Sequence, residues 1–71
     1  MLINIVIETP QVELVASNRY GKMFLTSEGY HINGDRRKFI NSIQRDLRSG
    51  DCIAEINARI VLNYIQTLDE I

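Results

Sequence analysis

The sequence predicts an α+β fold, in which a small antiparallel sheet of three or four strands precedes two consecutive helices packed on one of its faces. Two observations predict this order. Before residue 33 the apolar residues form short runs, one of which carries isoleucine at every second residue, and after residue 33 they recur at helical spacing. The connections between the short runs leave no room for a parallel crossover. We therefore expect a single compact domain over residues 1–71, with a β meander over 1–32 and a helix-turn-helix pair over 33–71.

The first half of the chain is predicted to hold the strands. They are residues 2–8, 12–16, 22–26 and, as a fourth, 30–32. In the first of these, Ile3, Ile5 and Ile7 share one face, and such an alternation of β-branched residues is typical of a half-buried strand. Asn18 and Gly21 are expected in the turn between the second and third strands, because both residue types tolerate a positive φ.

The second half is predicted to form two helices. They are residues 36–48 and 51–71. One face of the first helix is apolar and carries Phe39, Ile40, Ile43 and Leu47. Asp35 or Asn33 is expected to cap its first free amides. Gly50 suits the left-handed conformation that ends a helix, and Asp51 suits the cap of the next one.

The second helix carries more apolar surface than one core requires. At about 100° per residue its apolar side chains fill roughly 200°, whereas a stripe nearer 100° is usual. These side chains are Ile53, Ala54, Ile56, Ala58, Ile60, Val61, Tyr64, Ile65 and Leu68. A domain this small often depends on oligomerisation, so we expect the helix to contact a second copy as well as its own sheet. The predicted dimer interface is Ile53, Asn57, Ile60, Tyr64 and Leu68.

Asn57 falls near the middle of this apolar arc. A buried amide needs hydrogen-bond partners, and the sequence leaves two alternatives for the partner of Asn57. Asn57 either pairs with its symmetry mate across a dimer axis or bonds a carbonyl at the end of its own sheet.

Composition narrows the classes of function. A net charge of −1 is not that of a polycation that seeks nucleic acid or anionic lipid, and no apolar run is long enough to cross a membrane. With no signal-peptide pattern, a cytoplasmic location is expected. Cys52 and His31 are the only residues of their types, too few for a zinc site, and Cys52 is expected to be packed as a small hydrophobe. We expect no catalytic residue, no cofactor, no metal and no pocket of about 300 Å³ or more.

A basic stripe is predicted on the exposed side of the first helix. It consists of Arg37, Lys38, Asn41, Arg45 and Arg48. The stripe has four cations, and Arg36 beside it is a fifth. This part of the chain also contains two carboxylates, Asp35 and Asp46, so its local charge is five minus two, or +3. Three interpretations stay open: a solvated helix face, a contact with an acidic protein, or a contact with nucleic-acid phosphates.

The order of strand, helix, glycine-containing link and helix resembles the ribbon-helix-helix DNA-binding dimers. The candidate ribbon is residues 22–26 or 30–32, and the helices are 36–48 and 51–68. The resemblance implies a strand that pairs with its dimer mate and reads the major groove. The chain departs from that pattern in its extra N-terminal hairpin and in a ribbon whose only basic candidates are Lys22 and His31.

The function expected from these observations is that of a non-enzymatic interaction protein. It would form a homodimer and bind another, unidentified protein, which it regulates or inhibits. The alternative is a dimeric nucleic-acid-binding regulator that uses the basic stripe.

Overall fold

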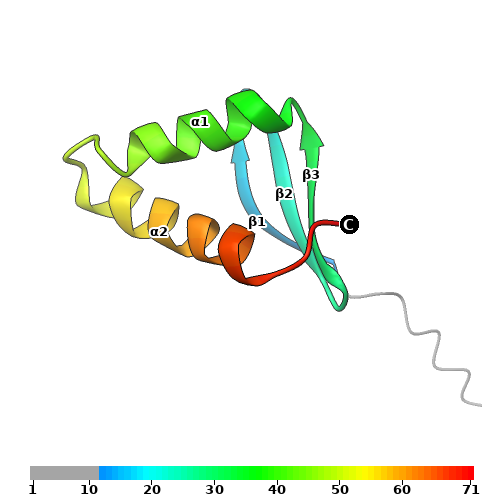
Figure 1. Cartoon of the computed structure of the whole chain (residues 1–71). Coiled ribbons are helices and arrows are strands. Elements are labelled where there is room, and N and C mark those ends of the chain that lie inside the picture. The colour runs from blue at the N-terminus through cyan, green and yellow to red at the C-terminus, as the bar shows by residue number, and fades with distance from the viewer. Residues whose placement is uncertain (1–11) are drawn as a thin grey trace, which may run out of the picture.

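The computed structural model describes residues 12–71 and shows a three-stranded antiparallel sheet followed by two helices (Figure 1). The elements are β1 (Glu13–Asn18), β2 (Gly21–Thr26), β3 (Gly29–Gly34), α1 (Arg36–Asp46) and α2 (Cys52–Thr67). The predicted fold class is confirmed. The strand predicted over residues 2–8 lies outside the described residues, and the segment 30–32 is part of a full strand.

The sheet is a meander in the order β1-β2-β3, so β2 is the central strand. Met23 of β2 pairs with Ala16 on one side and with Ile32 on the other, and these residues face the helices. On the opposite face Phe24 pairs with Leu14 and His31. The register between β1 and β2 shifts between Leu14 and Ala16, which is a β-bulge in the edge strand.

The turn between β1 and β2 is tighter than predicted. β1 continues to Asn18, and Asn18 Oδ1 accepts a hydrogen bond from the Tyr20 amide at 2.8 Å. Neither Asn18 nor Gly21 has a positive φ, so that expectation is wrong. Gly21 is needed for a different reason: a Cβ there would meet the Asn33 carbonyl oxygen at 2.6 Å.

Both helices begin where the sequence places their caps. The Asp35 side chain accepts from the Lys38 amide, and the Asp51 side chain accepts from the amides of Ile53 and Ala54. Gly50 has φ 79°, the left-handed conformation expected between the two helices. The first helix ends at Asp46, earlier than predicted, because its last turn tightens into shorter-range hydrogen bonds.

The second helix ends at Thr67, and the prediction of one helix as far as residue 71 is wrong. The chain turns back instead and meets the outer edge of β3. The Tyr30 amide donates to the Asp69 carbonyl, and the Ile71 amide donates to the Tyr30 carbonyl, both at 2.9 Å. These tertiary hydrogen bonds replace the last turn of the predicted helix.

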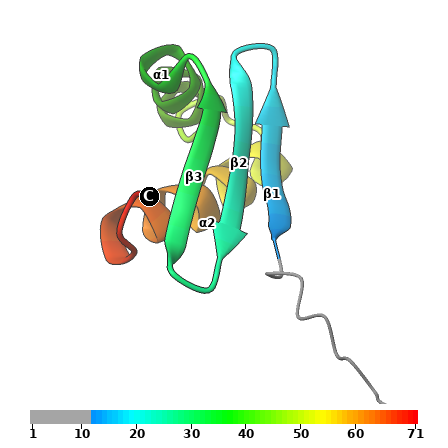
Figure 2. The same ribbon diagram turned by 90° about the vertical axis from the view of Figure 1, so that its right-hand side faces the viewer.

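The core lies between the helices and one face of the sheet (Figure 2). Its buried side chains are Met23, Tyr30, Ile32, Phe39, Ile43, Ala58 and Val61. Phe39 and Met23 are fully buried, and α1 packs on β2, β3 and α2. Within residues 12–71 no helix is both long and apolar enough to cross a membrane.

Candidate functional site

The apolar arc of α2 divides into a packed side and an exposed side. Ala58 and Val61 are buried against α1 and the sheet. Ile53, Ile56 and Ile60, which we call the apolar row, remain 73%, 55% and 47% exposed. The wide apolar arc predicts that α2 contacts two partners, its own sheet and a second copy. Residues 12–71 supply only the first of these contacts.

The structure brings the predicted interface residues to one side of α2. Ile53, Asn57, Ile60 and Leu68 are exposed there, and Tyr64 is half-buried against the core. Asn57 is not buried against its own chain. The Asn57 side chain is exposed, and no hydrogen bond joins it to residues 12–71, so its pairing with a carbonyl of its own chain and its pairing across a dimer axis both stay predictions.

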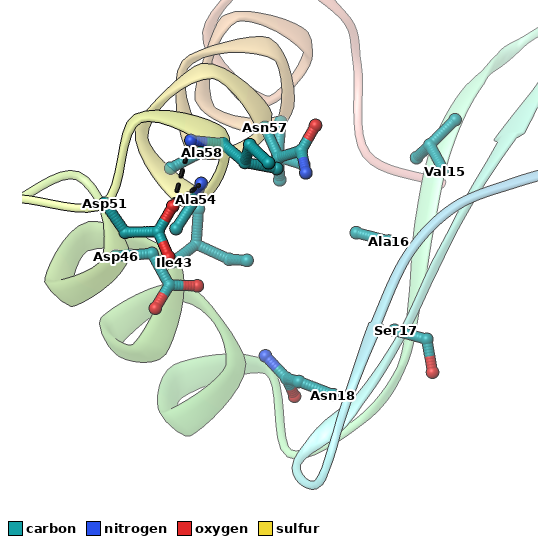
Figure 3. Close-up of a pocket in the computed structure, with 12 residues that line it drawn as sticks. Val15, Ala16, Ser17, Asn18, Ile43, Asp46, Asp51, Ala54, Asn57 and Ala58 are labelled. Carbon is teal, nitrogen blue, oxygen red and sulfur yellow. Dashed lines mark hydrogen bonds between the residues drawn. The ribbon is translucent and has the colours of Figure 1, made fainter. Parts of the chain in front are cut away.

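A groove of about 500 Å³ opens beside this side of α2, so the expectation that a domain this small lacks such a pocket is wrong. One wall is formed by β1 from Val15 to Asn18, and the other by α2 and the end of α1 (Figure 3). The helical wall is mixed: it holds Ile43, Ala54 and Ala58 together with the carboxylates of Asp46 and Asp51. The groove exists because the helices diverge from the sheet toward their connection, which Figure 1 shows as the part of the helical layer farthest from the strands.

Two amide side chains, Asn18 and Asn57, line the groove. Asn57 points from α2 toward β1, and Asn18 points its amide nitrogen toward α1 (Figure 3). The Asn18 Nδ2 atom is buried and has no hydrogen-bond partner among residues 12–71, although Asn18 Oδ1 accepts from the Tyr20 amide in the turn. A buried donor without a partner costs about 1–3 kcal/mol, so a polar group placed in this groove would gain stability from it.

All five residues of the basic stripe are exposed: four of them lie on α1, and Arg48 lies in the turn that follows it. Asn41, Arg45 and Arg48 border a shallow, open concavity of about 270 Å³ together with Gln44, which was not predicted. Arg37 and Lys38 lie on the same exposed side but outside this concavity.

Arg36 forms an ion pair with Glu70, so the +3 charge that the sequence implies around the basic stripe is lowered. Its Nε donates to both carboxylate oxygens of Glu70 at 2.8 Å. The hydrogen bond to Glu70, with a smaller contribution from Tyr30, raises the pKa of Arg36 above its usual value. A raised pKa favours the charged form, so Arg36 loses its proton only at strongly alkaline pH and the pair does not depend on its titration near neutrality.

His31 and Cys52 are placed apart from the core. His31 alternates with buried Tyr30 and Ile32 and is exposed, as predicted, with its Nδ1 3.1 Å from the Ile71 oxygen. Cys52 is exposed at the start of α2, so the expectation of a packed thiol is wrong. In the part of the chain that the structure describes, no three His, Cys, Asp or Glu side chains gather to hold a metal ion.

The strands do not offer the arrangement that the ribbon-helix-helix resemblance implies. β2 pairs with β1 on one side and with β3 on the other, so it has no edge for a dimer mate. The outer edge of β3 is met at Tyr30 by Glu70. Comparisons of this chain with protein-family models, with curated proteins and with solved structures give no match.

Proposed function

We propose that this chain is a non-enzymatic protein-interaction module, which forms a homodimer through the apolar row of α2 and regulates or inhibits a second, acidic protein bound at the basic stripe. The observation that supports it is the exposure of Ile53, Ile56 and Ile60 on one side of one helix. Single exposed hydrophobic residues are ordinary, but three at helical spacing form a continuous apolar surface. Pairing two copies of such a surface removes it from water at both helices.

The test is the mass of the full chain in solution. Sedimentation across a roughly hundredfold range of concentration should show a monomer converting to a dimer. Ile56→Asp and Ile60→Asp should shift this transition to higher concentration, because each buries a charge in the interface. Gln66→Asp is the matched control, since it adds the same charge to an exposed position of the same helix. A wild-type chain that stays monomeric throughout, or variants that dimerise as well as the control, would show that the apolar row is not a dimer interface.

Nucleic-acid binding through the basic stripe is the second candidate function. It is favoured by the concavity in which Arg45 and Arg48 lie beside two amide side chains, because guanidinium groups and amides can both bind phosphate oxygens. Filter binding to duplex DNA and RNA at low and moderate salt tests it. Affinity that falls steeply with salt would favour nucleic acid over an acidic protein, and no binding at low salt would rule it out.

A further inference from the structure

The helices cover one face of the sheet and leave the other uncovered. Figure 2 looks onto the uncovered face, and no element of residues 12–71 lies in front of the three strands. Met23 and Ile32 point into the core, so their neighbours along each strand point away from it. We call these outward positions the open face, and they are Leu14, Ser17, Lys22, Phe24, Thr26, Gly29, His31 and Asn33.

Phe24 lies at the centre of the open face, on the middle strand. It pairs with Leu14 of β1 and with His31 of β3, so these three side chains form one row across the sheet. Phe24 is half-buried and belongs neither to the core nor to the side chains packed against it, and Leu14 is 51% exposed. Among the described residues the Phe24 ring is therefore accessible to a flat ligand that approaches from solvent.

His31 supplies a second flat ring beside Phe24. The Cβ atoms of directly paired residues lie about 4.5–5.5 Å apart on the same face of a sheet. His31 is exposed, and its Nδ1 atom lies 3.1 Å from the Ile71 oxygen, a contact that restricts the orientation of the ring. Rings held side by side on an uncovered sheet are an arrangement on which unpaired bases stack.

The charge of the open face suits an anionic ligand. Lys22 is exposed two residues before Phe24, and no position of the open face holds a carboxylate, although the chain has nine. Ser17 and Asn33 pair with Lys22 from its two sides and are exposed as well. A hydroxyl, an amide and an ammonium group in one row can all bond phosphate oxygens.

We propose that the open face binds a single strand of nucleic acid, with one base stacked on Phe24, a second against His31 and a phosphate at Lys22. Every base has a π face, so such a site binds RNA and DNA with little dependence on their sequence. A duplex keeps its bases inside the stack and cannot use Phe24. The inference does not depend on the proposed dimer, because Ile56 and Ile60 lie on α2, on the other side of the sheet.

Binding of short oligonucleotides to the full chain tests the proposal. The probes are fluorescein-labelled oligouridylate and oligothymidylate, followed by fluorescence anisotropy at low salt, and a short duplex is the comparison. Phe24→Leu keeps an apolar side chain but removes the ring, so it should weaken the binding of both single strands by roughly fivefold or more. Phe24→Tyr keeps the ring and should bind within about twofold of the wild type. The duplex should bind the wild type more weakly than either single strand does.

The salt dependence of binding separates the open face from the basic stripe. Lys22→Gln should lower the steepness of log affinity against log salt by about 0.7, the value for one phosphate contact on a single strand. Lys38→Gln is the matched control, because it removes the same charge from an exposed position of the basic stripe and should leave the slope unchanged. If Lys38→Gln changes the slope and Lys22→Gln does not, phosphates bind at the basic stripe and the proposal is wrong.

Three further results would overturn the proposal. A wild-type chain that binds neither oligonucleotide at low salt has no such site, and equal affinities of Phe24→Leu and Phe24→Tyr would mean that no base stacks on the ring. Both variants should melt within about 4 °C of the wild type, because Phe24 lies outside the core, so a loss of binding reports the ring itself. If Phe24→Leu shifts the sedimentation of a chain that binds no oligonucleotide, the open face joins two copies instead. The proposed dimer is tested separately, at Ile56 and Ile60.

Discussion

The clearest quantitative prediction concerns Phe39, the larger of the two fully buried side chains. Phe39 extends from α1 into the core that also holds Met23, so its replacement by alanine leaves a cavity that rigid strands cannot fill. Such truncations cost about 3–5 kcal/mol. A chain of 71 residues is expected to have a free energy of unfolding of about 4–10 kcal/mol. Phe39→Ala should therefore remove between about a third and all of the stability, and Phe39→Leu should cost about 1 kcal/mol.

The assay is thermal unfolding followed by far-ultraviolet circular dichroism. A loss of 1 kcal/mol corresponds to roughly 4–8 °C in a domain of this size, so Phe39→Leu should melt that much lower and Phe39→Ala at least about 12 °C lower. Gln44→Ala is the control, because Gln44 is exposed on the same helix. The reasoning would be refuted if Phe39→Ala melted within about 4 °C of the wild type, since the core would then lie elsewhere.

Four further predictions follow from single contacts. Asp51→Ala should lower the free energy of unfolding in urea by about 1 kcal/mol, and Asp51→Asn by clearly less, because asparagine also accepts from the first amides of α2. Gly29→Ala should lower the melting temperature, since φ is 149° and the new Cβ would collide with the Asp69 carbonyl. Glu70→Gln should speed exchange of the backbone amides that join the tail to β3, measured by NMR, because the charge-assisted bond to Arg36 is lost. Cys52 should react with a thiol reagent in the folded chain as fast as in urea, because its side chain is exposed.

The elements that depend on local sequence were predicted well. Asp35 and Asp51 cap their helices because an N-cap needs only a short polar side chain and the amides that follow it. Gly50 has the left-handed conformation for a similar local reason. The exposure of His31 followed from strand alternation alone.

The features that depend on contacts between distant segments were not predicted. None of residues 68–71 is proline or glycine, so no local signal in them ends α2, and the hydrogen bonds to Tyr30 decide where the helix stops. The groove was missed because its size depends on how far the helices diverge from β1, which periodicity does not describe. Arg36 was counted in a basic surface because its partner, Glu70, lies far away along the chain.

The contact between Tyr30 and residues 69–71 also matters while the protein is being made. The ribosome releases the strands first, and a meander with short turns can form as soon as β3 has emerged. The outer edge of β3 gains its Asp69 and Ile71 partners only after all of α2 has been synthesised. During this interval the nascent chain displays an open strand at Tyr30, which is the kind of surface that neighbouring chains join and that chaperones shield. A released chain that ends at residue 67 keeps this edge open, so it should aggregate more readily than the chain that continues to residue 71.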